Sequence, residues 1–271
     1  MKDPYGKLGD VYTGPGFRLP FYIVSPWTRG GNVFVENADH ISQIKFIEQW
    51  QLAKGKNVTT DQIPTWRRTH MSDLTKAFDF NNPDYSLPTI PEISAPSVDS
   101  STGVWNGYAV CEALYHTQRP PVPYGKQTEA NSLVSERGFK TVRGDLTEGR
   151  YLVFEMNGFA LTNAGNLITA TPATSEHNTK CQRWIVHQLV LGTPQFTISS
   201  ALDGHFINSD GKLVAGNETA VVMTIKDLGN GKGLAISDRN NGYLFIDSSG
   251  HVGWAKKMIG FSTYSVTYND Y

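Results

Sequence analysis

Three copies of one glycine-bounded pattern in the second half of the chain restrict the fold more than any other feature. The copies begin at Gly158, Gly204 and Gly242. Each consists of a short alternating stretch, a tight turn that ends in glycine, and a second stretch, which predicts a β-hairpin. The three turns are Asn163-Ala-Gly165, Ser209-Asp-Gly211 and Ser248-Ser-Gly250.

One further strand is expected on each side of every hairpin. Those upstream are Tyr151–Phe154, Phe196–Ser199 and Leu234–Ser237, and those downstream are Trp184–Val186, Met223–Ile225 and Tyr264–Val266. Four strands repeated at intervals of about 40 residues indicate one unit that buries its apolar face against its own copies. The pattern predicts an all-β domain over residues 148–271, a β-trefoil with approximate threefold symmetry. A β-sandwich is the alternative, because short strands alone do not distinguish the two.

A trefoil raises the hypothesis of sugar binding. Gln182-Arg183-Trp184 has the Gln-x-Trp form found in ricin-type lectins, and the other two repeats lack it at the matching place. A single tryptophan at an inward-facing position more often belongs to the core. Packing is therefore the favoured interpretation of Trp184.

The first part of the chain has a different pattern. Phe21–Val24 is a short apolar run with prolines on both flanks, which predicts a central strand of a parallel sheet. Gly30 and Gly31 allow the backbone to turn. An apolar stripe at helical spacing follows and predicts a helix: Ile41, Ile44, Ile47 and Trp50.

Asp39 and His40 fall at the amino-terminal end of that helix, beyond the carboxyl end of the expected strand. In open α/β sheets ligands bind at this edge. A neighbouring carboxylate and imidazole can bind a metal or move protons. An aspartate before a helix is also the usual N-cap, and from the local pattern alone capping is the commoner role.

Arg67 and Arg68 are candidates for phosphate binding, because a guanidinium group matches two phosphate oxygens. The alternative, a solvated pair or a packing contact, is slightly favoured. For His70, a surface or structural role is favoured over catalysis.

Several motifs together resemble the phosphoesterase family of non-haemolytic phospholipases C and related acid phosphatases, with the fungal secreted branch most similar. The motifs occur in the family's order within residues 3–90: Leu19–Trp27, Asp39-His40-x-Ser42, Trp66–Arg68 and Ser72–Phe80. The resemblance implies an α/β sheet of the alkaline-phosphatase type with a metal site. It also implies a phosphoric ester hydrolase of phospholipase C type that acts on a phospholipid or another phosphoester, and secretion.

The same resemblance supplies roles for the site residues. Asp39 and His40 would lie in the active site, with Asp39 a ligand of a divalent metal ion whose identity stays open. His40 would face the phosphate or protonate the leaving group, and Arg67 and Arg68 would hold the phosphate.

The segment Asp3–Gly9 lies well inside proteins of that family. We therefore expect this chain to be the carboxyl-terminal part of a longer enzyme, without the amino-terminal half that carries the nucleophile. Alone it would be weakly active or inactive. We expect either a partner chain that supplies the missing half or a poorly soluble fragment with a stable trefoil. The competing hypothesis is a non-catalytic trefoil that binds cell-wall sugar or a membrane, attached to an inert α/β remnant.

Composition excludes some classes of partner. The net charge is −1 and there is no basic block, which argues against electrostatic binding of nucleic acid. No apolar run approaches the roughly 20 residues that span a bilayer, and the first residues contain no hydrophobic signal region. Cys111 and Cys181 fit either one disulfide or two thiols.

The expected organisation has three parts. A phosphoesterase fragment covers residues 1–95 and a connector covers 96–147, followed by the β domain over 148–271. Within the connector, one short element is expected around Tyr108–Tyr115. A bare linker of about fifty residues is unusual, so the connector is expected to pack across both domains.

Overall fold

The computed structural model describes residues 21–87, 92, 95–117, 138–147, 149–240 and 242–267. These residues divide into two compact units. One contains the described residues up to Asp84 together with Gly138–Thr267, and the other contains the described residues from Tyr85 to 117. The second unit holds helix α3 (Gly107–Tyr115), which confirms the short element expected there. The three-part domain division stays a prediction.

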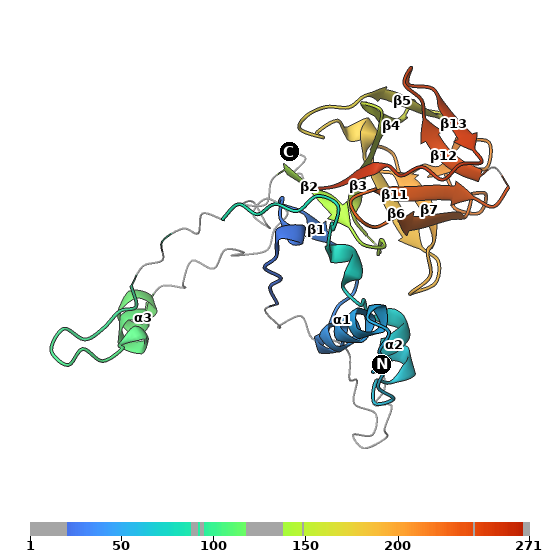
Figure 1. Cartoon of the computed structure of the whole chain (residues 1–271). Coiled ribbons are helices and arrows are strands. Elements are labelled where there is room, and N and C mark those ends of the chain that lie inside the picture. The colour runs from blue at the N-terminus through green and yellow to red at the C-terminus, as the bar shows by residue number, and fades with distance from the viewer. Residues whose placement is uncertain are drawn as a thin grey trace, which may run out of the picture. The chain divides into compact units, whose positions relative to one another are not determined.

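The α-helices of the first unit precede most of its strands (Figure 1). A 3-10 turn, η1 (Pro26–Thr28), is capped by the hydroxyl of Ser25, which accepts a hydrogen bond from the Trp27 N–H. The elements that follow it in the amino-terminal part are β1 (Val33–Phe34), α1 (His40–Ala53), α2 (Thr65–His70) and η2 (Thr75–Ala77).

The predicted strand over Phe21–Val24 is wrong. These residues have no regular structure, and Tyr22 and Val24 are 83% and 89% exposed. A strand needs a neighbour for its backbone groups, and no strand in the described part of the chain lies beside this run. Parallel pairing occurs instead about ten residues later, where β1 pairs with β2 (Gly138–Arg143).

The expected α/β sheet is therefore reduced, among the described residues, to this one parallel pair. Asp39 and His40 still lie between a strand and a helix, but the strand is β1. Helix α1 forms as predicted. Its apolar stripe, however, faces outward, with Ile44, Ile47 and Trp50 between 45% and 51% exposed.

The strands predicted for the three repeats are all present, together with a 3-10 turn, η4 (Lys180–Gln182). They are β3 (Tyr151–Met156), β4 (Phe159–Asn163), β5 (Ile168–Pro172), β6 (Trp184–Gln188), β7 (Gln195–Ser200), β8 (Phe206–Ile207), β9 (Leu213–Val214), β10 (Met223–Asp227), β11 (Leu234–Asp238), β12 (Gly242–Ile246), β13 (Val252–Ala255) and β14 (Ser262–Thr267).

Six of these strands form a ring. Antiparallel pairing runs from β14 through β3, β6, β7 and β10 to β11. Leu234 at the start of β11 and Phe261 just before β14 exchange two backbone hydrogen bonds of 2.9 and 2.8 Å, which link the two ends of the series. The pairs β4–β5, β8–β9 and β12–β13 are hairpins, one in each repeat.

The core of the ring comes from the inward-facing positions of every repeat. Alternation along the strands buries these side chains: Leu152, Phe154, Trp184, Val186, Phe196, Ile198, Met223, Ile225, Leu234, Ile236 and Leu244. Trp184 is fully buried and its Nε1–H donates to the Leu161 carbonyl at 2.9 Å. Gln182 is buried too and donates to Thr171 and Pro172. The Gln-x-Trp motif therefore belongs to the interior.

Strand β2 links the helical segment to the ring. It pairs with β1 on one side and with β14 on the other. Arg143 extends the link, because its Nη1 donates to the carbonyls of Trp27 and Ala77 at 3.1 and 3.0 Å. Residues 138–147 are the described end of the connector expected over 96–147. They pack against both the helical segment and the ring.

Cys111 and Cys181 are both free thiols. Within the described residues, no helix is long and apolar enough to cross a membrane.

We predict that ring closure depends on the absence of a side chain at Gly233. A Cβ there would lie 2.1 Å from the Phe261 carbonyl oxygen, whereas a Cβ at Gly229, also at positive φ, would meet nothing within 4 Å. In urea unfolding, Gly229→Ala should cost about 1–2 kcal/mol from backbone strain alone. Gly233→Ala should cost clearly more, because the backbone at the Leu234–Phe261 bridge must move. Equal losses would show that the close approach does not matter.

Candidate functional site

The amino-terminal end of α1 is fixed by Asp39. Its Oδ1 accepts a hydrogen bond from the Ile41 N–H at 2.9 Å, and the Ser42 hydroxyl accepts one from the Asp39 N–H at 3.1 Å. This is a reciprocal capping box. The other oxygen, Oδ2, forms an ion pair with Arg67. The Asp39 side chain is consequently only 6% exposed, and the capping role favoured by the local pattern is present.

His40 is the first residue of α1 and is exposed. Its backbone position is set by the capping box beside it. Asp39 and His40 are thus adjacent, with the carboxylate engaged and the imidazole accessible to solvent. An accessible imidazole can reach a substrate as a donor or acceptor of a proton.

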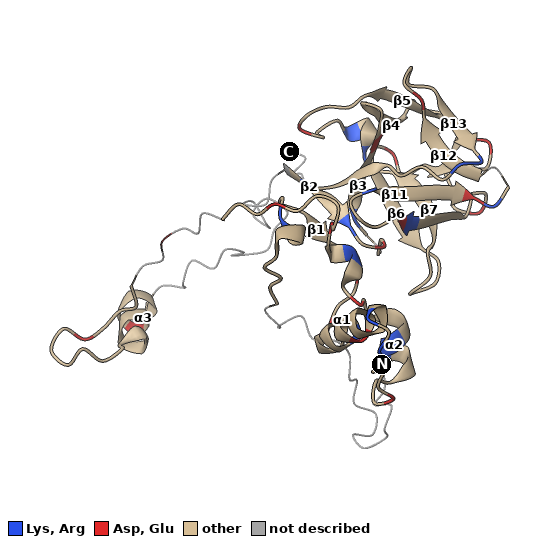
Figure 2. Ribbon diagram, viewed as in Figure 1, with Lys and Arg blue, Asp and Glu red and all other residues tan. Residues whose placement is uncertain are grey.

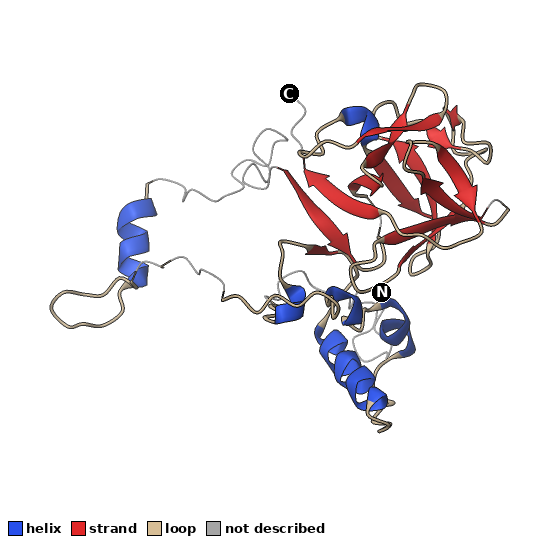
Figure 3. Cartoon of the chain, turned by 45° about the horizontal axis from the view of Figure 1, so that its top comes forward, coloured by secondary structure: helices blue, strands red, loops and turns tan. Residues whose placement is uncertain are grey.

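Arg68 forms a separate ion pair. Its guanidinium group donates to both oxygens of Glu48, at 2.7 and 3.3 Å, and to the Thr60 carbonyl at 2.6 Å. The Arg68 hydrogen bonds hold the pKa of the buried Glu48 carboxyl below its usual value, against the opposing effect of burial. Lys45 adds hydrogen bonds to the carbonyls of Arg68 and Met71. These contacts hold α1 and α2 side by side (Figure 3).

The two arginines expected to hold phosphate are therefore both bound to carboxylates of the chain. The structure brings Arg67 together with Asp39 and keeps Arg68 with Glu48. This is the packing role slightly favoured from the sequence. Phosphate binding by Arg67 and Arg68 stays a prediction.

His70 has a mainly structural environment. Its Nδ1 lies 2.7 Å from the Trp66 carbonyl oxygen, and its ring stacks on that of Trp66 with centroids 4.6 Å apart. The ring also lies beside Gly192 of the connection between β6 and β7, where an added Cβ would be 2.6 Å from His70.

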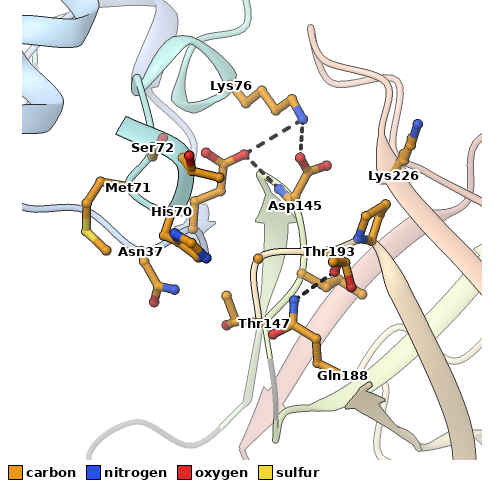
Figure 4. A pocket seen from close by; sticks show the side chains of 15 residues that line it. Asn37, His70, Met71, Ser72, Lys76, Asp145, Thr147, Gln188, Thr193 and Lys226 are labelled. Carbon is orange, nitrogen blue, oxygen red and sulfur yellow. Dashed lines mark hydrogen bonds and ion pairs between the residues drawn. The ribbon is translucent and has the colours of Figure 1, made fainter. Parts of the chain in front are cut away.

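A cavity of about 380 Å³ lies between the α2–η2 segment and the ring (Figure 4). Its lining includes Glu36, His70, Lys76, Asp145 and Lys226. The side chains come from segments far apart in the sequence, and most of the labelled ones are polar or charged.

A network of hydrogen bonds and ion pairs lies along one side of the cavity. Lys76 Nζ lies 2.5 Å from Asp145 Oδ2 and 3.8 Å from Glu36 Oε1. The Asp145 N–H donates to Glu36 at 2.9 Å, and the Asp227 N–H donates to Asp145 Oδ1 at 2.9 Å. The Gly144 N–H donates in turn to the Asp227 carboxylate. The carboxylates of Glu36, Asp145 and Asp227 come from three segments of the chain. Lys76 and a few backbone N–H groups serve all three.

Burial dominates the electrostatics of this network. It raises the pKa of Glu36, and hydrogen bonds from Ser72 and the backbone of Asp145 offset only part of that effect. Burial likewise raises the pKa of Asp227. Burial opposes the charge on Lys76 most strongly, but the hydrogen bond to Asp145 and the charges of Asp145, Glu36 and Asp227 together outweigh it, and the pKa of Lys76 is raised.

Sequence reasoning missed this network. Lys76 is the unassigned position inside the motif Ser72–Phe80, and nothing in the local pattern distinguishes it. Its partner Asp145 is 69 positions away, and Glu36 and Asp145 are 109 apart. Only tertiary packing brings them together.

The described residues do not fit a metal site by themselves. They contain no group of three or more His, Cys, Asp or Glu side chains that could hold an ion. The two oxygens of Asp39 are engaged by Ile41 and Arg67. Metal binding needs several converging ligands, so Asp39 could supply at most one of them.

Part of the chain is similar to known phosphoesterases. Residues 1–53, which include Asp39 and His40, match the Phosphoesterase family. The chain is 36% identical over 128 residues to a non-hemolytic phospholipase C of Burkholderia pseudomallei, which covers 47% of this chain and 15% of that protein. It is 42% identical over 82 residues to a non-hemolytic phospholipase C of Pseudomonas aeruginosa, which covers 30% of this chain and 11% of that protein.

A hemolytic phospholipase C of Pseudomonas aeruginosa is 35% identical over 94 residues, 32% of this chain and 12% of that protein. The chain therefore spans between 11% and 15% of the length of these three curated relatives. The similarity supports the phosphoesterase and phospholipase C resemblance. The fungal branch and the position within a longer enzyme stay predictions.

The two carboxylates Glu36 and Glu48 should respond oppositely to pH. The raised pKa of Glu36 means that its contribution to stability grows as pH falls and is lost as pH rises through that pKa, above the ordinary glutamate value of about 4.3. The lowered pKa of Glu48 means that its contribution is present above about 4.3 and is lost as pH falls through the lower value.

Urea unfolding of the wild type, Glu36→Gln and Glu48→Gln between about pH 8 and about pH 3 tests both signs. Relative to Glu36→Gln, the wild type should become more stable as pH falls toward about 4.3. Relative to Glu48→Gln, it should become less stable below that value. The same pH dependence for both pairs would contradict the opposite environments.

Proposed function

We propose that this chain is part of a phosphoric ester hydrolase of phospholipase C type, and that its amino-terminal segment contributes His40 to the active site. The observation that carries this proposal is the position of His40, exposed on the first turn of α1 beside the fixed Asp39. Asp39 and His40 lie inside the stretch that matches the Phosphoesterase family. A phospholipid phosphodiester is the proposed substrate, and secretion belongs to the same proposal.

Three features suit this chemistry. The positive end of the α1 dipole lies at this terminus and favours a phosphate group. His40 can protonate the leaving oxygen from that place. Asp39 acts by position, because its cap and its ion pair with Arg67 hold the first turn of α1.

A divalent metal with Asp39 as one ligand remains part of the proposal, and it would supply electrostatic stabilisation of the phosphoryl oxygens. The further ligands would come from outside the described residues, and Arg67 would have to release one Asp39 oxygen. We therefore assign no step of the reaction to it.

We also propose a partner surface. The outward stripe Ile44, Ile47 and Trp50 is more apolar than an exposed helix face usually is. A polypeptide that carries the remaining part of a phospholipase C catalytic domain, covalently joined or separate, would cover it.

For the second half of the unit, we propose the β-trefoil fold. The six-stranded ring and the three hairpins, one in each repeat, support it. The alternative function, a sugar-binding module, loses its sequence support because Gln182 and Trp184 are buried.

A chimera tests the catalytic role. Residues 21–84 of this chain would replace the matched stretch of the Burkholderia pseudomallei phospholipase C, and hydrolysis of p-nitrophenylphosphorylcholine would be measured. His40→Ala should lower kcat about a hundredfold or more, as loss of a general acid does. For the matched control, the β domain of this chain, residues 148–271, is fused to the carboxyl end of the chimera. The control variant is then His251→Ala in that domain. Unchanged kcat in the His40 variant would refute the role.

We further predict that residues 1–271 alone, with added divalent metals, hydrolyse p-nitrophenyl phosphate, p-nitrophenylphosphorylcholine and phosphatidylglycerol weakly or not at all. Catalysis of phosphoryl transfer depends on holding all groups in one arrangement, and the described residues supply few of them. Turnover near 10 per second, a typical enzyme value, that disappears in His40→Ala would show a complete site and contradict this prediction.

A further inference from the structure

Three consecutive apolar side chains form the exposed tip of the connection between β6 and β7. Leu189, Val190 and Leu191 are 48%, 58% and 58% exposed. We call them the apolar tip. The rest of the connection is Gly192-Thr193-Pro194, so the whole connection lacks charged residues. In Figure 2 the connection between β6 and β7 is accordingly tan.

The backbone of this connection is ordered by its own hydrogen bonds. The Leu189 N–H donates to the Gln195 carbonyl at 3.0 Å. The N–H and hydroxyl of Thr193 both donate to the Val190 carbonyl, at 3.0 and 2.7 Å. The Gln188 side chain donates to the Thr193 carbonyl at 2.8 Å. The turn therefore holds the apolar tip outward.

The fold does not require apolar residues at this place. The corresponding connection between the second and third repeats, residues 228–233, reads Leu-Gly-Asn-Gly-Lys-Gly. That connection is polar and contacts the amino-terminal segment, where Asn230 accepts a hydrogen bond from the Phe80 N–H. The turn between the second and third repeats is thus made mainly with polar residues. The turn between the first and second repeats exposes leucine and valine instead. Contiguous exposed apolar side chains commonly mark a contact surface.

A positive charge lies beside the carboxyl-terminal end of the same connection. Lys226 on β10 is exposed and lines the same cavity as Thr193 and Pro194. The neighbouring Ile225 N–H donates to the Pro194 carbonyl at 2.9 Å, so the two segments are in direct contact. Apolar side chains next to a lysine match the order of a bilayer surface, with acyl chains below a layer of phosphate groups.

We propose that the apolar tip, Leu189–Leu191, inserts into the surface of a phospholipid bilayer, with Lys226 at the level of the lipid phosphates. The choice of a lipid surface over a protein partner rests on the proposed phospholipase C function, since such an enzyme meets its substrate at a membrane. The docking contact itself lies outside the Asp39–His40 segment and needs no catalysis.

Co-sedimentation of the full chain with vesicles tests the proposal. The vesicles would be phosphatidylglycerol mixed with phosphatidylcholine, or phosphatidylcholine alone. The double variant Leu189→Ser with Leu191→Ser should lose at least about tenfold in partition coefficient, because two largely exposed leucines no longer enter the acyl region. Leu202→Ser is the matched control, since Leu202 is 45% exposed in the connection between β7 and β8. It should bind as the wild type does.

Lys226→Gln gives an independent measurement. It should weaken binding to the phosphatidylglycerol vesicles about fivefold at low salt, as expected for one lysine near an anionic surface. Binding to phosphatidylcholine alone should change little. Val190→Asp is a second tip variant, and it should abolish sedimentation with both kinds of vesicle while the thermal unfolding midpoint stays near the wild-type value.

Equal vesicle binding by the wild type and both tip variants would overturn the proposal. So would a concentration-dependent dimer in lipid-free sedimentation that the tip variants abolish while vesicle binding persists, because the tip would then contact a second copy. His40→Ala should bind vesicles as the wild type does. An inactive chimera with tip-dependent vesicle binding would refute the proposed function and leave the docking surface standing.

Discussion

The pairing of β2 with both β1 and β14 is the constraint on which the arrangement of the first unit depends. β2 lies between the helical segment and the ring, and its backbone satisfies groups of both. Arg143 and the network of Glu36, Lys76, Asp145 and Asp227 reinforce the junction beside it. Buried carboxylates are costly unless they are bonded. The lysine and the backbone donors meet that need, and they do so only when the two parts are docked.

The helical segment is organised by charge more than by apolar packing. The buried Glu48 binds Arg68, and the shielded Asp39 binds Arg67, while the apolar stripe of α1 points outward. Removing one partner of such a pair leaves an uncompensated buried charge. The pairs therefore fix how α1 meets α2, and they leave the exposed stripe and the exposed His40 available for contacts beyond the described residues.

The catalytic and docking proposals assign different tasks to the two halves of the unit. The amino-terminal segment carries the similarity to phosphoesterases and the candidate imidazole. The ring of strands is closed and encloses a buried apolar core, so a short connection on it can present apolar side chains without loss of the core. The β domain would then position the amino-terminal segment at a surface.

The sequence by itself determined the local elements: the strands of the repeats from their alternation, helix α1 from its spacing, and the cap from Asp39. It also favoured the core for Trp184, which is fully buried. It failed at Phe21–Val24, because an apolar run becomes a strand only where another strand lies beside it. It missed Lys76 and Asp145, because their attraction depends on proximity that 69 intervening positions conceal. Tertiary structure alone decided ring closure, the engagement of Arg67 and Arg68, and the outward direction of the α1 stripe, since each results from long-range pairing that no local pattern encodes.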